Sequence, residues 1–406
     1  MNFKSQFLQE LKWRGFIAQM THQKELDELM SREKIAAYIG FDCTATSLHV
    51  GSLIQIMILR LLQKHNHRTI ILLGGGTTRI GDPSGKDEAR QILSEDKIQQ
   101  NLQGIKNTLA KFISFENNTA ILVNNDDWLK NLNYIEFLRD IGRHFSVNRM
   151  LTFESVKTRL ERDQPLSFLE FNYMILQAYD FYILNKDLNC HLQIGGSDQW
   201  GNIVNGIELI RRVHPEQQAF GLTSPLLTTS DGKKMGKTAD GAVWLDDTIF
   251  SPFDYFQYFR NTTDADTIKF LKLFTDLSHE EISQFENLQG QEINKAKEIL
   301  AYETTKICHG EKAAFEALNK AREIFISKNN SAFTEIIITL NGEKKLVEIM
   351  KEINACASNG EARRLIEGHG IKINDEVVVD INFTINAACE FDLQIGKKKF
   401  FRIIIQ

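Results

Sequence analysis

Short apolar runs alternate with longer helical patterns through the first half of this chain. Four of the runs predict strands, at 35–41, 69–73, 120–123 and 190–194. The segments 53–63 and 168–184 are apolar on nearly every side, so we expect them to be helices that pack on a sheet. This alternation is typical of an α/β fold built on a doubly wound parallel sheet, an architecture that binds nucleotides.

The pattern changes twice along the rest of the 406 residues. Consecutive helices without strands are predicted first, and short helices followed by strands at 371–373, 376–379 and 400–405 come after them. The polar stretch 328–331 between the two is typical of a linker. We therefore predict an α/β domain (1–230), a loop and connection (231–250), an α-helical domain (251–327), a linker (328–339) and a small α+β domain (340–406).

Charge and cysteine usage exclude several classes of protein. The 48 basic and 53 acidic residues give a net charge of −5, which argues against a protein that coats nucleic acid non-specifically, and we expect no DNA partner. The five cysteines are scattered and form no C-x-x-C pair, so neither a disulfide framework nor a zinc site is indicated. No stretch approaches the length of a membrane span, and the first residues lack a signal-peptide pattern. We expect a cytoplasmic protein that does not enter a membrane.

The first candidate site follows the predicted strand 35–41. Thr44 and the sequence H-V-G-S at 49–52 lie where this strand leads into the next helix. Backbone N–H groups and the positive end of a helix face the carboxyl edge of such a sheet, where anions bind. His49 beside Gly51 therefore suits contact with a phosphate group, although an ordinary polar residue at a helix start is an equal alternative.

A glycine run at 74–76 begins the second candidate site, which leads to Lys86 and Arg90. Glycines let a ligand approach the backbone, so the two cations suit a basic clamp that closes on phosphate. The segment is not a P-loop, because no Ser or Thr follows Lys86. A surface turn with solvated charges is the alternative.

The third candidate site is the loop at 231–238, which holds Lys234 and Lys237 on either side of Gly236. Two lysines in a loop that contains glycine suit a cationic lid over a polyphosphate. A solvated lysine-rich loop is the alternative.

Polar residues on an otherwise apolar helix form the fourth candidate site. Tyr173, Gln177 and Asp180 fall on one helical face among apolar neighbours. A ligand with a phenol and an ammonium group would satisfy such a buried polar stripe, and three side chains turned to solvent are the alternative. Gly196 and Asp198 end the next predicted strand in a way that suits recognition of ribose hydroxyls.

The combination of H-V-G-S with K-M-G-K-T at 234–238 resembles the two signature sequences of class I aminoacyl-tRNA synthetases. The chain is similar to bacterial tyrosyl-tRNA synthetases over essentially its whole length, most closely at 38–51, 80–86, 137–148, 192–202 and 234–245. The resemblance implies a Rossmann-type catalytic domain, an α-helical domain on the anticodon side of the tRNA and a C-terminal RNA-binding domain. It also implies a homodimer built around 128–160, and transfer of tyrosine to tRNA(Tyr) through a tyrosyl-adenylate made from ATP.

The same resemblance implies a role for each candidate residue. Tyr38 and Asp180 would bind the tyrosine phenol, and the rest of the tyrosine would be held by Asp82, Tyr173, Gln177 and Gln199. ATP would be bound by Asp42, Gly51, Ser52, Gly196, Asp198 and Lys237. The departing pyrophosphate would be stabilised by Thr44, His49, Lys86, Arg90, Lys234, Lys237 and Thr238. Magnesium would accompany the ATP phosphates, with no tightly bound metal in the protein.

Three positions depart from the family pattern. Ile39 stands where the family often has Cys, and Ser52 stands where it often has His or Asn, both near the ATP ribose. Because an isoleucine side chain forms no hydrogen bond, we expect fewer ribose contacts here. The pair Thr78-Arg79 replaces the more usual Gly-Leu, and the sequence alone offers no physical account of that change.

Basic clusters at Arg363-Arg364 and 397–399 favour contacts with RNA phosphates over a solvated lysine tail.

Two alternative functions remain open at this point. A tryptophanyl-tRNA synthetase would share both signatures, but it must bind an indole N–H, which only donates, and the pair Tyr38 and Asp180 argues against it. A synthetase-derived RNA-binding protein without charging activity would be expected to lose the signature lysines, and both are present.

Overall fold

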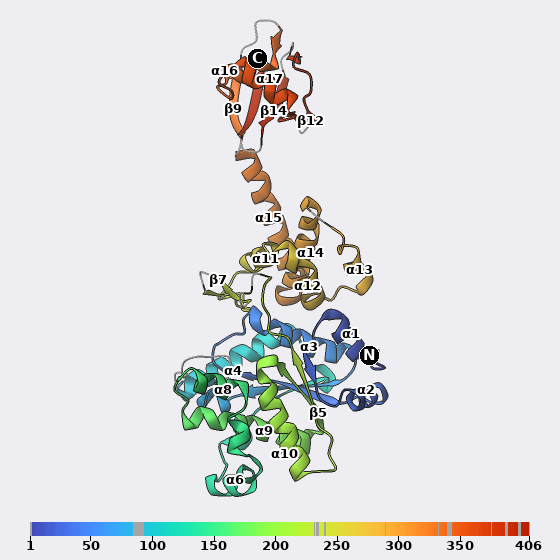
Figure 1. Ribbon diagram of the computed structural model, residues 1–406, viewed down its shortest axis with the longest axis vertical. Coiled ribbons are helices and arrows are strands. Elements are labelled where there is room, and N and C mark those ends of the chain that lie inside the picture. Colours follow the sequence, from blue (N-terminus) through green and yellow to red (C-terminus); the bar gives the residue numbers. More distant parts are fainter. Residues whose placement is uncertain are drawn as a thin grey trace. The chain divides into compact units, whose positions relative to one another are not determined.

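The computed structural model describes residues 2–83, 93–230, 232, 235–238, 241–288, 290–331, 333–338, 343–374, 376–385, 389–396 and 399–405 (Figure 1). The chain divides into two compact units, Met1–Leu318 and Asn319–Gln406. None of the helices in the described part of the chain has the length and apolar character that crossing a bilayer requires.

A six-stranded sheet forms the centre of the first unit. Its order is β1 (Gln19–Met20), β6 (Phe220–Ser224), β5 (Cys190–Gly196), β2 (Ala36–Asp42), β3 (Arg68–Gly74) and β4 (Ala120–Asn124). Every neighbouring pair is parallel except β1 with β6. The predicted doubly wound sheet is confirmed. The strand order reverses between β2 and β5, and ligands bind in such sheets at the carboxyl ends of the strands on either side of the reversal.

Helices cover both faces of this sheet. On one face α9 (Phe168–Leu188) and α10 (Trp200–Val213) run side by side, and their apolar residues pack on alternate residues of β2 and β3 (Figure 1). On the other face α3 (Leu53–Lys64) contacts β2, β3 and β5. The helix α9 starts at a capping box of Ser167 and Glu170, and the same glutamate forms a buried ion pair with Arg159 at 3.0 Å. Both predicted apolar helices are present, and each packs buried residues on the sheet, although Phe168 and Leu169 at the start of α9 are exposed.

The remaining elements of this α/β part surround the sheet. The α-helices are α1 (Gln6–Arg14), α2 (Gln23–Arg32), α4 (Glu95–Ala110), α5 (Asp126–Leu129), α6 (Tyr134–Asp140), α7 (Val147–Met150) and α8 (Glu154–Glu161). Short 3₁₀ helices are η1 (Val50–Ser52), η2 (Thr77–Arg79), η3 (Glu116–Asn118), η4 (Gly142–His144) and η5 (Ser197–Gln199). A small hairpin of β7 (Lys237–Thr238) and β8 (Gly241–Ala242) follows β6.

Consecutive helices follow this hairpin, as the sequence predicts. They are α11 (Pro252–Arg260), α12 (Asp264–Phe274), α13 (His279–Ser283), η6 (Gly290–Glu292), α14 (Ile293–His309) and α15 (Glu311–Ser331). Their core is aromatic and includes Phe256, Phe259 and Phe270, all fully buried. The buried guanidinium of Arg14 ties α1 to these helices, because it donates to the backbone carbonyls of Lys272, Thr275 and Leu277 at 2.7, 2.9 and 3.0 Å.

The second unit contains its own sheet and core. The five-stranded sheet has the order β12 (Glu376–Val377), β11 (Ile371–Ile373), β14 (Cys389–Ile395), β15 (Lys399–Ile405) and β9 (Phe333–Ile338). A second pair, β10 (Lys344–Lys345) with β13 (Thr384–Ile385), and the helices α16 (Leu346–Glu352) and α17 (Asn359–Glu367) complete it.

The stretch 328–339, predicted as a linker, differs from that expectation in the structure. Its first residues continue α15 to Ser331, and 333–338 form β9, which pairs in parallel with β15. The reason is the apolar end of the segment, since Ile338 is buried in the core of the second unit. The polar residues at the beginning of this segment predict a linker, whereas the residues at its end form a strand of the second unit's sheet.

Candidate active site

A cavity of about 360 Å³ lies where the sheet order reverses, between the carboxyl ends of β2 and β5. Twelve residues predicted from the sequence line it: Tyr38, Asp42, Thr44, His49, Gly51, Ser52, Asp82, Tyr173, Gln177, Asp180, Gly196 and Gln199. They come from β2, the segment after it, η1, the segment after η2, α9, the end of β5 and η5. The fold therefore brings most of the predicted site into one cavity.

Tyr38 and Asp180 form a deeply buried polar part of the cavity, each with 1% of its surface exposed. The Tyr38 hydroxyl has no hydrogen-bond partner among the residues that the structure describes. The Asp180 carboxylate accepts hydrogen bonds from Trp128 Nε1 at 2.7 Å and Asn125 Nδ2 at 2.9 Å. Burial raises the pKa of Asp180 to about 7, and these two hydrogen bonds oppose the rise. The pair leaves one hydroxyl unsatisfied beside one buried carboxylate.

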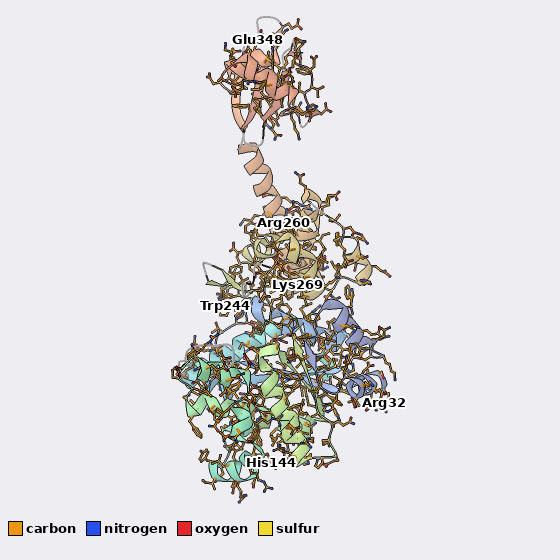
Figure 2. All side chains as sticks on the ribbon, in the orientation of Figure 1. Arg32, His144, Trp244, Arg260, Lys269 and Glu348 are labelled. Atoms are coloured by element: carbon orange, nitrogen blue, oxygen red, sulfur yellow. The ribbon has the colours of Figure 1, made fainter. Side chains whose placement is uncertain are left out.

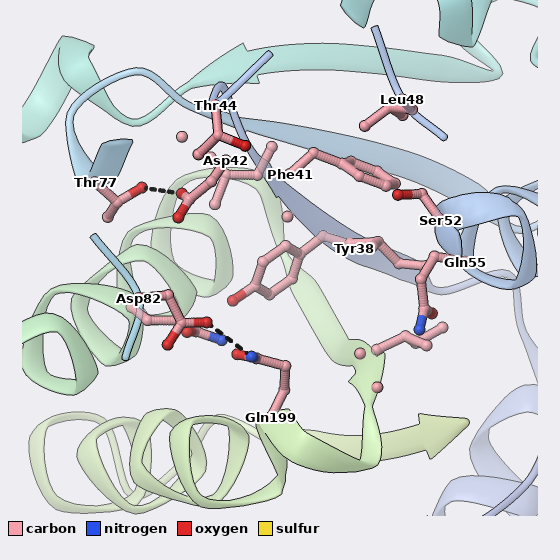
Figure 3. Close-up of a pocket in the computed structure, with 18 of the residues that line it drawn as sticks. Tyr38, Phe41, Asp42, Thr44, Leu48, Ser52, Gln55, Thr77, Asp82 and Gln199 are labelled. Atoms are coloured by element: carbon pink, nitrogen blue, oxygen red, sulfur yellow. Dashed lines mark hydrogen bonds between the residues drawn. The ribbon is translucent and has the colours of Figure 1, made fainter. Parts of the chain in front are cut away.

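A chain of hydrogen bonds connects Asp180 to Asp42. Asn125 Nδ2 also donates to Thr77 Oγ1 at 3.0 Å, and that hydroxyl donates to Asp42 Oδ1 at 2.8 Å (Figure 3). Asp42 Oδ2 accepts a further hydrogen bond from the Tyr173 hydroxyl at 3.1 Å. Two carboxylates from different elements are thus held in fixed positions around the cavity.

A second polar cluster joins the middle of α9 to the start of α10. Gln199 Nε2 donates to Asp82 Oδ2 at 2.8 Å (Figure 3). Asn202 donates to Gln177 Oε1 at 2.9 Å and to Gln199 Oε1 at 3.1 Å. These amide and carboxylate groups can bind an ammonium group and a carboxylate in the same cavity.

His49 is held at the start of η1 by its own neighbours. Its Nδ1 accepts a hydrogen bond from the Gly51 N–H at 2.9 Å, so the neutral imidazole carries its proton on Nε2 as a donor. A Cβ at Gly51 would lie 2.5 Å from His49 Cε1, which explains the glycine. The His49 ring meets the Trp244 ring edge-on with centroids 6.1 Å apart.

The third predicted loop meets the first motif through the backbone. Figure 2 labels Trp244 on the segment that follows β8, and this residue forms a β-bridge with His49. Gly236 has φ +93°, its N–H donates to the Tyr258 hydroxyl at 3.2 Å, and a Cβ there would lie 2.9 Å from Gly51 N. The two signature segments are therefore in contact at their glycines.

The cationic residues predicted to contact phosphate are described only in part. Lys86, Arg90 and Lys234 lie outside the described residues. Lys237 and Thr238 are described by their backbone, which forms β7 beside Gly236.

Of the predicted ATP-binding residues whose side chains the structure describes, Asp198 does not line the cavity. Asp198 is exposed and not among the lining residues, although a Cβ at Gly196 would lie 2.5 Å from its Oδ1. Ile39 and Ser52 both line the cavity. In the described part of the chain, no three His, Cys, Asp or Glu side chains gather as a set of metal ligands.

Comparison with known proteins decides the family. The model of class I tRNA synthetases for tryptophan and tyrosine, "tRNA synthetases class I (W and Y)", matches residues 30–326. This chain belongs to that family. The predicted resemblance is confirmed, and so is the predicted fold of a class I synthetase.

Several relatives of this synthetase match it over its full length. The "Tyrosine--tRNA ligase" of Wolbachia pipientis subsp. Culex pipiens (strain wPip) is 54% identical and the alignment covers 100% of this chain and 99% of the relative. The "Tyrosine--tRNA ligase" of Rickettsia bellii (strain RML369-C) is 51% identical, with 98% and 100% covered. A C-terminally truncated mitochondrial tyrosyl-tRNA synthetase of Aspergillus nidulans has a TM-score of 0.70 at 30% identity, with 79% of this chain and 94% of that chain covered. A tryptophanyl-tRNA synthetase of Encephalitozoon cuniculi, with a TM-score of 0.57 at 12% identity and 78% and 90% covered, shows the fold alone.

Among the described residues, the polar ones at this synthetase's site that were not predicted include Gln55, Thr77, Asn125, Trp128, Gln193 and Asn202. Thr77 follows β3 and Asn125 follows β4, so the rule that sites gather at the carboxyl ends of parallel strands points to both. Gln55 Nε2 donates to Ser224 Oγ at 3.0 Å, and its Oε1 is buried without a partner. No pattern in the sequence singles out Gln55, Gln193 or Asn202.

Proposed function

We propose that this chain activates L-tyrosine with ATP and transfers it to the 3′-terminal ribose of tRNA(Tyr). The observation that carries the proposal is the buried pair of Tyr38 and Asp180, an unpartnered hydroxyl beside a carboxylate. A phenol both donates and accepts a hydrogen bond, so it satisfies both groups. The relatives named as tyrosine–tRNA ligases, at 51 and 54% identity over the full length, support the same substrate.

In the first step the tyrosine carboxylate attacks the α-phosphorus of ATP in line. A carboxylate–phosphorus bond forms, the bond to the bridging oxygen breaks, and pyrophosphate leaves with that electron pair. Since a carboxylate is already a nucleophile, the step needs positioning and charge stabilisation rather than a general base. We assign Asp82, Tyr173 and Gln177 to the ammonium group of tyrosine and Gln199 to its carboxylate. The hydrogen bond between Gln199 and Asp82 supports this assignment, because the ammonium group and the carboxylate are close together in the amino acid.

The ATP side follows the same logic. We assign ATP binding to Asp42, Gly51, Ser52, Gly196, Asp198 and Lys237, and stabilisation of the departing pyrophosphate to Thr44, His49, Lys86, Arg90, Lys234, Lys237 and Thr238. The Nε2–H of His49 supports its part, because a neutral donor beside close-approach glycines can reach a phosphate oxygen. We propose that magnesium arrives with the ATP phosphates as part of the substrate and that the protein holds no resident metal.

The second step transfers tyrosine to tRNA, and we assign RNA binding to the second unit. Arg363 and Arg364 are exposed on α17, where their guanidinium groups can contact phosphates. The cluster at 397–399 lies almost entirely outside the described residues. We retain the division into a catalytic domain (1–230), a connection (231–250), an anticodon-side helical domain (251–327) and a C-terminal RNA-binding domain, and we place the enzyme in the cytoplasm, where tRNA is charged.

We also propose that the enzyme is a homodimer through the region predicted at 128–160. Large exposed apolar side chains gather there and just beyond it: Tyr134, Ile135, Leu138, Val147, Leu151, Leu160, Phe168 and Leu169. Ile135 and Phe168 are 69% and 70% exposed, which is costly for apolar surface that faces water. Sedimentation of Ile135→Asp with Phe168→Asp tests the proposal. We expect monomers, whereas Ile249→Asp, also at an exposed apolar residue, should stay dimeric; a dimeric double variant would reject this interface.

The proposed substrate is tested by ATP–pyrophosphate exchange with each of the twenty amino acids. We expect rapid exchange with tyrosine alone and strong rejection of phenylalanine, because phenylalanine leaves the two buried polar groups unpaired. Faster exchange with tryptophan than with tyrosine would favour the tryptophanyl alternative. Tyrosine binding without exchange would favour a synthetase-derived RNA-binding protein.

A further inference from the structure

Each of the three residues of η2 forms its own side-chain contacts with neighbouring parts of the chain. Thr77 donates to Asp42 at 2.8 Å, as described above. The Arg79 guanidinium pairs with Glu95 at 2.7 Å and with Asp126 at 3.0 Å, which ties η2 to α4 and α5. Thr78 lies between them and is buried. The Thr78-Arg79 departure from the family's usual Gly-Leu therefore adds side-chain contacts that a Gly-Leu pair could not make.

Thr78 contacts the peptide that separates two predicted site residues. Its Oγ1 accepts a hydrogen bond from the Cys43 N–H at 2.7 Å and donates to the Gly74 carbonyl at 2.5 Å. The Thr78 hydroxyl therefore donates one hydrogen bond and accepts another, so it is not left unpaired in the core. Cys43 is fully buried and is flanked by Asp42 and Thr44, both of which line the cavity.

The carbonyl of the same residue is held from the opposite side. Asn101 Nδ2, on α4, donates to the Cys43 carbonyl at 2.8 Å, and Asn101 is fully buried. Both backbone polar groups of Cys43 are therefore bound by side chains from different elements, Thr78 and Asn101. A buried peptide group without a partner is costly, so this residue cannot easily adopt another orientation.

The helix α4 also fixes the segment that follows Cys43. A Cβ at Gly104 would lie 1.9 Å from the Thr46 carbonyl oxygen, so the backbone of the segment lies directly on the helix. The Thr108 hydroxyl lies 3.1 Å from the Ser47 hydroxyl. Asn101, Gly104 and Thr108 are three and four residues apart, and they form one face of α4.

We propose that Thr78 and Asn101 are positioning residues that clamp the Cys43 peptide and thereby set the places of Asp42 and Thr44 for adenylate formation. The inference rests on the proposed roles of Asp42 and Thr44 in the function above. It assigns a purpose to the threonine at a position where the family often has glycine, because glycine has no acceptor to offer the Cys43 N–H.

Thr78→Val tests the clamp, because valine keeps the shape and removes the hydroxyl. We expect the rate constant for adenylate formation to fall about tenfold, the effect of leaving one buried N–H unpaired, while the dissociation constant of tyrosine changes little. Thr78→Ser keeps the hydroxyl and should retain a rate close to that of the unchanged enzyme. Thr305→Val is the matched control, since the buried Thr305 hydroxyl donates to the Ala301 carbonyl of its own helix.

Three results would overturn the clamp: an unchanged rate in Thr78→Val, a rate in Thr78→Ser as low as that in Thr78→Val, or an equal loss in Thr305→Val at an equal loss of melting temperature. If Thr78→Val does not yield folded protein, Thr78→Ala removes the same hydroxyl without putting a methyl group in its place, and it is judged by the same criteria.

Thr44→Ala separates failure of the clamp from failure of the proposed site. If Thr44→Ala leaves adenylate formation unchanged, the proposed role of Thr44 is wrong. If Thr44→Ala slows the step and Thr78→Val does not, only the clamp is wrong. Because Thr78 is expected to act partly through Thr44, the double variant should be less impaired than the product of the two single effects, and full multiplicativity would reject that coupling.

Discussion

The Tyr173 hydroxyl donates a hydrogen bond to Asp42 Oδ2 at 3.1 Å, and so joins α9 to the end of β2 across the cavity. Asp42 also accepts from Thr77, which belongs to η2. The Asp42 carboxylate thus joins three separate parts of the chain: β2, η2 and α9. A change to Tyr173 is therefore expected to act on tyrosine binding and on the ATP side together.

Tyr173→Phe removes this hydrogen bond and the proposed contact with the substrate ammonium group. We expect the Michaelis constant for tyrosine to rise by a few-fold to about tenfold, since a hydrogen bond contributes roughly 0.5 to 1.5 kcal/mol. Tyr179→Phe is the matched control, because Tyr179 lies on the same helix and does not line the cavity. Exchange kinetics at varied tyrosine concentration measure both, and equal constants in the two variants would remove Tyr173 from the binding site.

Tyr38→Phe should separate substrate binding from stability. The Tyr38 hydroxyl is buried without a partner, so its removal deletes a hydrogen bond that forms only with bound substrate. We expect the Michaelis constant for tyrosine to increase and the melting temperature of the free enzyme to stay the same or rise. Calorimetry with exchange kinetics checks both. A lower melting temperature with unchanged kinetics would mean that the hydroxyl serves the fold instead.

Asp180 predicts an acid limit to tyrosine use. Burial raises the pKa of Asp180 to about 7. The carboxylate form, which is proposed to accept a hydrogen bond from the substrate phenol, predominates above that pH. The ratio kcat/KM for tyrosine should therefore fall as the pH drops through about 7. A raised folded-state pKa also means that this group favours the folded state most below the unfolded pKa, and that this contribution is lost as the pH rises through about 7.

Asn125→Ala tests whether Asp180 sets that acid limit. The Asn125 amide stabilises the carboxylate at 2.9 Å, so its loss should raise the pKa of Asp180 and move the limit to higher pH. Trp128→Phe removes the other donor and should move it in the same direction. The pH profile of kcat/KM measures the limit, and a profile that stays in place in both variants would assign it to another group.

The fold was predictable where local pattern and burial agree. The strands β2 to β5 are apolar runs between helices, and all four were predicted. The strand β6, which lies between β1 and β5, was missed because its buried residues include Gly221, Thr223 and Ser224, which do not form an apolar run. Burial of those polar residues depends on the neighbouring strands and on α10, which only the assembled sheet supplies.

The site was predictable where a residue is proposed to contact the substrate and much less where it contacts another side chain. The resemblance to the family implies the roles proposed for Tyr38 and Asp180, and the chemistry of a phenol agrees with them. Asn125 acts on Asp180, which lies 55 residues away in the sequence. Thr78 likewise accepts from Cys43, which lies 35 residues away. No local pattern encodes such partners, so the purpose of Thr78 became clear only from the folded chain.

The exposed arginines of α17 predict a separation of the two reaction steps. Arg363→Ala with Arg364→Ala should reduce tRNA charging and weaken its dependence on salt concentration, because fewer phosphate contacts release fewer counterions. ATP–pyrophosphate exchange, which needs no tRNA, should not change. Lys24→Ala with Arg32→Ala is the matched control, since both residues are exposed on α2 (Figure 2 labels Arg32). Equal charging by the two double variants would remove α17 from the RNA surface.

Gly104→Ala tests how closely α4 holds the segment after Cys43. Alanine in a helix interior normally stabilises by about 1 kcal/mol relative to glycine. Here the added Cβ would lie 1.9 Å from the Thr46 carbonyl oxygen, so the backbone must separate from the helix. We therefore expect a lower melting temperature and slower adenylate formation, with tyrosine affinity less affected. Gly360→Ala on α17, where the nearest atom would be Ser358 Oγ at 3.7 Å, is the control and should preserve exchange. If Gly104→Ala instead raised the melting temperature and left exchange intact, the segment would be free to move and α4 would not position the site.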